Sequence, residues 1–210
     1  MTNEAPRGVL GAVLWYAALA LAVNLVRYFG ELQAWSPAIF ATDAGGGGSP
    51  LGITWLVLPF GFVIGRRLAQ NGHRPAATGK ALLLHLAGIG LLVGLYAATM
   101  QLVPGWRPKG CVINAGAVLC GLFAFVAFRR AYVACLLAGI LGRLPVIAIQ
   151  FHAVQNDFDV HFAKGPPDAP KEDVLFLLTM AQSVFWPFAF TTLVGGLFAV
   201  LGAATVRKRG

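Results

Sequence analysis

The sequence predicts an all-α fold: a polytopic bundle of about six transmembrane helices with the N-terminus and the C-terminus on the cytoplasmic side. Hydrophobic residues make up 58% of the 210 residues and charged residues only 11%, whereas soluble domains carry roughly 25% charged residues. The apolar residues also gather in stretches of the ~20 residues that a helix needs to span a bilayer. No soluble fold of this size has enough interior for so much apolar surface, so we expect lipid to cover the remainder.

Six mostly uncharged stretches give the predicted spans, all within a single transmembrane domain that covers residues 1–210. They lie at about 8–27, 50–66, 81–104, 110–128, 131–151 and 174–206. The second is short for a span. The sixth is longer than a span requires, so we expect it to tilt, to kink at Pro187 or to protrude into the headgroups. Outer loops are predicted at 28–49, which holds the glycine run 45–48, and at 152–173, where Asp168 is expected to cap the last helix.

Basic residues set the predicted orientation. With the N-terminus inside, the inner segments hold ten Lys or Arg and one acidic residue, and the outer segments hold four Lys or Arg and seven acidic residues. Because Lys and Arg accumulate in cytoplasmic loops, this asymmetry places both ends in the cytoplasm, with a bacterial-type inner membrane as the expected location. The net charge of +8 is therefore interpreted as a topology signal, and no nucleic-acid partner is expected.

The shortest predicted connection joins the fourth and fifth stretches through residues 128–131, which contain no Gly, Pro, Asn or Asp. The alternative is one continuous helix of ~40 residues, about 60 Å long. Such a helix would leave too much apolar surface outside the bilayer. We therefore expect a hairpin, with Arg129 and Arg130 held at the inner headgroups.

Two pairs of glycines, Gly61–Gly65 and Gly90–Gly94, follow the GxxxG spacing that lets helix backbones approach closely in lipid. Gly195, Gly196 and Ala199 offer a similar surface of small residues. We expect these positions to pack within the bundle, and a dimer interface is the alternative.

Most polar side chains of the predicted spans lie toward the outer ends of their helices when each residue is given a rise of ~1.5 Å. The inner halves are nearly all apolar, with His85 as the main exception. No catalytic residue is predicted. The residues predicted to bind a ligand are Arg143, Gln182, Ser183, Asn24, Asn114 and Gln150.

Helical spacing groups several of these side chains on two faces. Arg143 and Gln150 share a face of the fifth helix, and Asp157 and His161 would join them if that helix ran on. Arg143 and Gln182 fall at similar depth, so the two faces could oppose each other. The second face, spaced i, i+3, i+4, i+7, comprises Thr179, Gln182, Ser183 and Trp186.

Arg143 is the most unusual residue in the predicted spans. An arginine at mid-bilayer costs ~2.5–3.5 kcal/mol on the insertion scale and is usually paired or faces a cavity. No predicted span contains a carboxylate, so Arg143 must use amides, hydroxyls, backbone carbonyls, water or a bound anion. One interpretation is an outward-facing polar pocket for an anionic group. The other is that Arg143 extends to the outer headgroups or braces the bundle through Gln182.

The second outer loop carries His152, Asp157, Asp159 and His161. Imidazole and carboxylate groups together could hold a divalent metal, but this spacing matches no specific metal motif such as HExxH. A solvated acidic loop is the alternative interpretation. The sequence therefore names no cofactor, and a metal site in residues 152–161 stays a hypothesis.

Three functions follow from these patterns as competing hypotheses. The sequence favours a structural or accessory subunit of a membrane complex, with membrane lipids and other membrane subunits as partners, because small chains without a motif more often pack than catalyse. The second hypothesis is a small carrier or binding protein with Arg143 as the anion contact. The third is a membrane enzyme with a metal site in the outer loop, although the sequence favours a protein that is not an enzyme.

Overall fold

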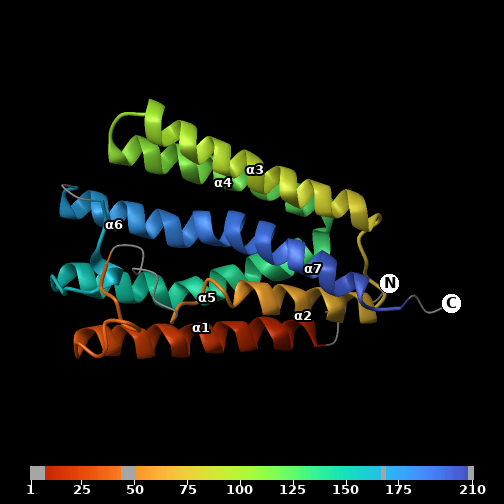
Figure 1. The fold of residues 1–210 in the computed structure, drawn as a ribbon, viewed down its shortest axis with the longest axis horizontal. Helices are drawn as coiled ribbons and strands as arrows, with labels where there is room; N and C mark the ends of the chain where they lie inside the picture. The colour runs from red at the N-terminus through yellow and green to blue at the C-terminus, as the bar shows by residue number, and fades with distance from the viewer. Residues whose placement is uncertain (1–7, 44–50, 167–168, 208–210) are drawn as a thin grey trace.

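The computed structural model describes residues 8–43, 51–166 and 169–207 of the chain. These residues form helices joined by turns and loops, and no strand occurs among them. Figure 1 shows the helices side by side along one long axis, with the start of the first helix and the end of the last helix at the same end of the bundle. The glycine run 45–48 and the predicted cap at Asp168 lie outside the described residues.

The last three helical elements follow one another without a break and form one helix of 34 residues, Lys171–Ala204. Its middle part, η3, is π-helical, and η2 is a short 3₁₀ turn. In chain order the elements are α1 (Val9–Leu32), α2 (Val57–Gln70), α3 (Thr78–Leu102), α4 (Trp106–Ala127), α5 (Arg129–Gln155), η2 (His161–Ala163), α6 (Lys171–Met180), η3 (Ala181–Val194) and α7 (Gly195–Ala204).

Five helices are long and apolar enough to cross a membrane: α1, α3, α4, α5 and the continuous helix from α6 to α7. By length and composition the fold is therefore compatible with a membrane protein. The stretch predicted as the second span is not a full-length helix, because α2 begins at Val57 and has 14 residues. Its length is about 21 Å, against ~30 Å for the hydrocarbon core of a bilayer.

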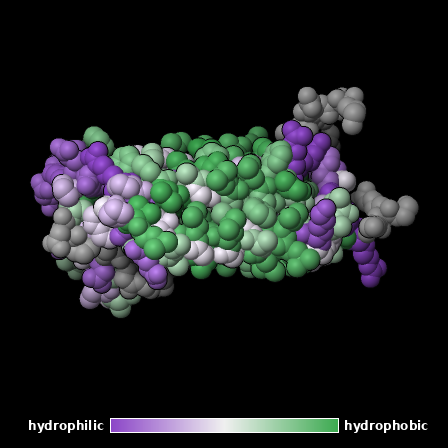
Figure 2. Space-filling view, turned by 90° about the horizontal axis from the view of Figure 1, so that it is seen from above, coloured by the Kyte–Doolittle hydropathy of each residue, from purple (hydrophilic) through white to green (hydrophobic). Residues whose placement is uncertain are grey.

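The surface is apolar over the middle of the bundle and polar at its ends. Figure 2 shows hydrophobic residues covering the central part of the visible face and hydrophilic residues gathered at both ends. Large apolar side chains of the spanning helices are widely exposed, and Trp15, Leu83 and Val126 are each more than 60% exposed. Such a continuous apolar surface is unfavourable in water and suits contact with lipid.

The first helix is longer than predicted. α1 continues to Leu32, beyond the predicted end of the first span at residue 27. Glu31 therefore lies inside a helix, one turn after Arg27, rather than in a loop. The predicted span 8–27 itself contains no carboxylate, but the longer helix carries Glu31. One helix can hold both charges because Arg27 and Glu31 pair on one face.

The chain reverses between α4 and α5, where the sequence predicts a hairpin. Phe128 alone separates the two helices, at φ −155° and ψ 79°. Its N–H donates to the Ala124 carbonyl at 3.0 Å, and its own carbonyl accepts the Tyr132 N–H at 2.9 Å. The backbone groups next to the turn thus keep their partners, which explains how the chain turns without Gly or Pro.

Small residues bring the backbones of α2 and α7 into contact. A Cβ atom on Gly61 would overlap the carbonyl oxygen of Gly195, at the η3–α7 boundary. A Cβ atom on Gly65 would overlap the carbonyl oxygen of Ala199. This GxxxG pair therefore packs within the bundle, as the sequence predicts.

The second GxxxG pair does not follow that prediction. Nothing lies within 4 Å of a Cβ atom added at Gly90 or Gly94. α3 contacts α4, η3 and α7, and these glycines lie on the side of α3 away from those contacts. Internal packing is therefore wrong for this pair, and the GxxxG spacing alone did not show which side of α3 the bundle would cover.

The long helix from α6 to α7 is the centre of the bundle, because α2, α3, α4 and α5 all contact it. Two side chains support its π-helical part. The Phe185 N–H donates to Asn114 Oδ1 of α4 at 3.0 Å, and the Thr191 hydroxyl donates to the Trp186 carbonyl at 2.9 Å. Pro187, which has no N–H to donate, also lies in this stretch. Altered helical bonding of this kind is frequent at functional sites.

We predict that Gly65→Ala destabilises the fold, whereas the matched change Gly90→Ala leaves it equally or slightly more stable. The methyl group at residue 65 must push α2 away from α7, at a cost of ~1–3 kcal/mol. At residue 90 it meets open space and improves helix propensity by up to ~1 kcal/mol. Thermal unfolding of both variants in detergent measures the difference. Equal midpoints would contradict backbone contact between α2 and α7.

Candidate functional site

Arg143 lies near the middle of α5 and is 5% exposed. Its Nη1 donates to Gln182 Oε1 of η3 at 3.0 Å. The guanidinium carbon lies 4.4 Å from the centre of the Trp186 ring, also in η3, which is a cation–π contact. The structure thus brings together Arg143 and Gln182 and keeps the cation inside the bundle, so Arg143 does not extend to the headgroups.

Several polar atoms around Arg143 have no partner. Among the residues that the structure describes, Arg143 Nε and Nη2, the Tyr16 hydroxyl and Gln150 Oε1 are buried without a hydrogen bond. Tyr16 of α1 lies close to this part of α5, because its ring packs against Gly142, the residue before Arg143. A buried polar group without a partner costs ~1–3 kcal/mol, and a charged one costs more. We call Arg143, Gln182, Trp186 and Tyr16 the Arg143 site.

Three other predicted ligand residues are satisfied by backbone groups. The amide nitrogens of Asn24 and Asn114 each donate to a carbonyl one turn earlier in their own helix, at 2.7 and 2.8 Å. Asn114 Oδ1 accepts the Phe185 N–H, and the Ser183 hydroxyl donates to a carbonyl one turn earlier at 2.6 Å. No hydrogen bond in the described structure joins these three side chains to Arg143.

The polar face predicted to run from Arg143 and Gln150 to Asp157 and His161 does not form. α5 ends at Gln155, and Asp157 has a φ of 54°. This left-handed conformation cannot continue a helix, and Asp tolerates it better than most residues. His161 lies instead in η2 and contacts α1.

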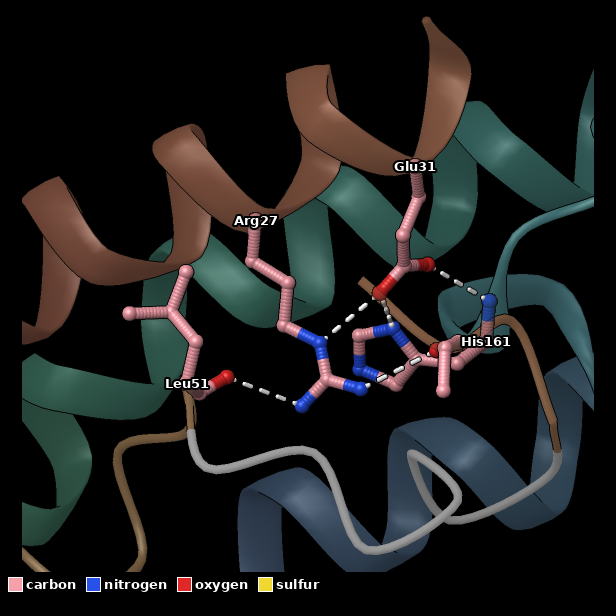
Figure 3. A network of polar contacts seen from close by, with 5 residues as sticks. Arg27, Glu31, Leu51 and His161 are labelled. Carbon is pink, nitrogen blue, oxygen red and sulfur yellow. Dashed lines mark hydrogen bonds and ion pairs between the residues drawn. The ribbon is translucent and has the colours of Figure 1, made fainter. Parts of the chain in front are cut away.

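A second polar group, shown in Figure 3, lies in the last turns of α1, at the end of the bundle opposite the start of that helix (Figure 1). Arg27 Nε donates to Glu31 Oε1 at 2.7 Å. Arg27 Nη1 and Nη2 donate to the carbonyls of Leu51 and Ala41, at 3.0 and 3.3 Å. Glu31 Oε2 accepts the His161 backbone N–H at 2.9 Å, and Glu31 Oε1 lies 2.6 Å from His161 Nδ1. We call Arg27, Glu31 and His161 the Glu31 network.

The Glu31 network ties four segments together: α1, the loop after it, the stretch before α2, and η2. Arg27 and Glu31 are both buried, so removing either one would leave an uncompensated charge at a cost of ~3–5 kcal/mol. A further link lies nearby, where the Tyr28 hydroxyl is 2.8 Å from His152 Nδ1 of α5. These contacts fix the loops over this end of the bundle.

The histidines and aspartates of residues 152–161 do not converge on one point. Tyr28 engages His152, and Glu31 engages His161. Within the described part of the chain, no group of three or more His, Cys, Asp or Glu side chains could hold a metal ion. The structure therefore gives the metal hypothesis no support. The two aspartates form exposed ion pairs, Asp157–Lys171 and Asp159–Lys164, each at 2.8 Å.

A cavity of about 350 Å³ opens at the same end, between the last turn of α5 and the start of α6. Val154 and Val174 contribute apolar walls, and the two Asp–Lys pairs also line it. Arg143 precedes Val154 by eleven residues, and Gln182 follows Val174 by eight. The Arg143 site is thus about 12–16 Å deeper between the same two helices, and Gln150 lies between cavity and site.

His161 is held in its neutral form. Burial lowers the pKa of His161 below its ordinary value of 6.5, and the hydrogen bond to Glu31 raises it only in part. The positive charge of Arg27 lowers the pKa further. Since Arg27 already neutralises Glu31, a neutral imidazole that donates from Nδ1 to the carboxylate fits this arrangement.

Sequence reasoning missed the roles of four members of these two groups. Arg27 and Glu31 are four residues apart, the spacing of an ion pair on one helix face, so that signal was present. Trp186 falls on the predicted polar face of the last helix, but its contact with a cation was not predicted. Tyr16 gave no signal, because its position depends on how closely α1 approaches α5 at Gly142.

Comparison with known proteins identifies no relative. No family model, no curated protein and no solved structure matches the chain. The function is therefore argued from the fold, the Arg143 site and the Glu31 network.

We predict that the protein loses stability as the pH falls below ~6.5. Because the pKa of His161 is lower in the fold than in the unfolded chain, the unfolded chain binds more protons between the two values. The stability present above 6.5 is therefore lost as the pH falls through the folded pKa. Thermal unfolding in detergent between about pH 8 and about pH 5 measures the slope.

The control is His161→Gln, which keeps a side-chain donor near Glu31 but does not titrate. It should show a flatter dependence of the unfolding midpoint on pH. An equal slope in the two proteins would assign the pH dependence to other groups.

Proposed function

We propose that this chain is a multi-pass protein of a bacterial-type inner membrane that binds a small anion at Arg143. The observation that carries the proposal is a buried guanidinium whose Nε and Nη2 have no hydrogen-bond partner among the described residues. Within the described part of the chain, its hydrogen bond goes to Gln182, which is neutral. The described residues orient this cation, and none of them contributes an opposite charge to it in a hydrogen bond or ion pair.

The proposal includes six membrane crossings with both ends in the cytoplasm. Support comes from the two ends of the helical bundle: α1 starts and α7 ends on the same side (Figure 1), which requires an even number of crossings. The five long helices give an odd number, so the second crossing is assigned to the stretch that ends in α2. Reporter fusions at the two termini should both read out in the cytoplasm; opposite compartments would exclude this topology.

The charge of Arg143 argues for an anion rather than for bracing alone. Arg143 is the one Lys, Arg, Asp or Glu in residues 131–156 of the sequence, and residues 174–206 contain none. A cation at this depth costs at least ~2.5–3.5 kcal/mol on the insertion scale. If Arg143 and Gln182 served only to brace the bundle, two apolar residues could take their place without that cost. Binding an anion, in contrast, requires the positive charge.

The cavity between α5 and α6 supports an approach from the outer side in the proposed topology. It lies above the Arg143 site between the same helices. Gln150, with a buried unpartnered Oε1, marks a polar point between the two.

We predict that Arg143→Gln removes a stabilising effect of anions that the original protein shows. Purified protein in detergent is unfolded by heat in a series of sodium salts of acetate, chloride, sulfate and phosphate. A bound anion at 100 times its Kd stabilises the fold by about 2.7 kcal/mol, so the midpoint should rise with at least one of these anions. Without an effective anion, Arg143→Gln should unfold at a higher temperature, because it removes a buried charge.

Arg130→Gln is the matched control, because Arg130 is exposed at the other end of the bundle and contacts His73. It should respond to anions as the original protein does. If Arg143→Gln responds to every salt as the original protein does, the proposed function is wrong.

A structural or accessory subunit is the second candidate function, and the outward face of α3 favours it. Gly90 and Gly94 leave a flat surface with nothing within 4 Å of an added Cβ atom, which suits close approach by a helix of another membrane subunit. Leu at both positions should then release a co-purifying partner. A protein that purifies alone from its native membrane would remove the support for this candidate.

A further inference from the structure

We infer that the anion held at Arg143 is a monocarboxylate, gripped side-on by Arg143 Nε–H and Nη2–H with the Tyr16 hydroxyl as a third donor. This inference rests on the proposed function and adds the chemical class of the ligand. It starts from which atoms of the guanidinium are used and which are free.

The free donors of Arg143 lie on one edge of the guanidinium. Gln182 Oε1 occupies Nη1, and the two nitrogens without a partner in the described structure are Nε and Nη2. In a planar guanidinium the Nε–H and one Nη2–H point the same way, forming a fork of two parallel donors. Such a fork matches the two oxygens of a carboxylate and gives bidentate hydrogen bonds.

The fork is held in place before any ligand binds. Gln182 fixes one end of the guanidinium, and the Trp186 ring, 4.4 Å from the guanidinium carbon, covers one of its faces. The backbone of η3 positions both partners. A rigid planar donor edge favours a planar acceptor over a spherical one, because a halide cannot align with both N–H groups at their best distance.

Charge selects the monoanion. Arg143 contributes one positive charge, and the nearby partners Gln182, Trp186 and Tyr16 are neutral donors or acceptors. A carboxylate with one negative charge leaves the site neutral. A phosphate monoester carries about −1.5 to −2 at neutral pH, and a dicarboxylate carries a second charge, so either would leave an uncompensated charge in a medium of low dielectric.

Tyr16 supplies the third donor. Its hydroxyl is buried and has no partner among the described residues, and its ring lies against Gly142, the residue before Arg143. A phenol donates to a carboxylate oxygen more strongly than to a neutral acceptor. The surroundings are otherwise aromatic, with Phe60 at 5.4 Å from the Tyr16 ring and Phe190 at 5.1 Å from the Trp186 ring. The remainder of the ligand is therefore expected to be apolar.

The test measures the binding of radiolabelled propionate to the purified protein in detergent, with unlabelled propionate, succinate, phosphate and chloride as competitors. We expect saturable binding that unlabelled propionate displaces, with the other three anions at least about tenfold weaker. Tyr16→Phe should weaken propionate binding by about fivefold, the effect of one hydrogen bond. Each variant is checked for a single peak in size-exclusion chromatography.

Arg143→Lys separates the fork from the charge. Lysine keeps the positive charge but presents a point charge without parallel donors. We expect it to bind propionate at least about tenfold more weakly while its affinity for chloride changes little, so the preference for carboxylate is lost. An unchanged preference in Arg143→Lys would overturn the side-on mode of binding.

Different results would overturn the carboxylate inference and the anion site at Arg143. If chloride or phosphate binds in a manner that depends on Arg143 while propionate does not, the carboxylate inference is overturned and the anion site stands. If no anion binds in a manner that depends on Arg143, both are overturned. If propionate and succinate compete equally, the argument from charge fails.

Discussion

A charge enclosed by an apolar bundle must find its partner within the fold or in a ligand, and this constraint governs both polar groups of the protein. Arg27 meets it within the chain, through Glu31 and two loop carbonyls. Arg143 meets it in part, through one amide oxygen and one aromatic face. The two arginines thus differ in how far the chain itself compensates their charge. Arg27 is paired as in a structural ion pair, whereas Arg143 keeps unpaired donors that a ligand could use.

The Glu31 network and the Arg143 site lie in different parts of the bundle. The Glu31 network pins the loops at one end of the bundle, and the contact of α2 with α7 at Gly61 and Gly65 fixes the central helix from the other side. Between these two points lies the π-helical stretch that carries Gln182 and Trp186. The contact with α2 holds the part of this helix that follows Gln182 and Trp186. A helix held by backbone contact can present these side chains at fixed positions, which is what recognition of a small ion requires.

The sequence predicted the all-α class, the hairpin at Phe128 and the approach of Arg143 to Gln182, because each depends on apolar stretches or on helical spacing. It did not predict that the stretch 50–66 would begin with a turn at residues 53–56 and hold a helix of only 14 residues, because hydropathy does not distinguish such a turn from the helix that follows. The sequence also did not show Glu31 as a partner of Arg27, because Arg27 ends the uncharged stretch and Glu31 falls in the predicted outer loop 28–49. Tyr16 could not be predicted at all, since its place beside Arg143 is a consequence of tertiary packing.

An experimental density map of the protein in lipid nanodiscs, at a resolution that shows side chains and ordered ions, would examine Arg143 most directly. The account predicts density for a non-protein group against the edge formed by Nε and Nη2, with Gln182 still on Nη1 and Tyr16 turned toward the same density. A map in which that edge bonds to a carboxylate or carbonyl of the chain itself would contradict it, because the guanidinium would then be satisfied without a ligand.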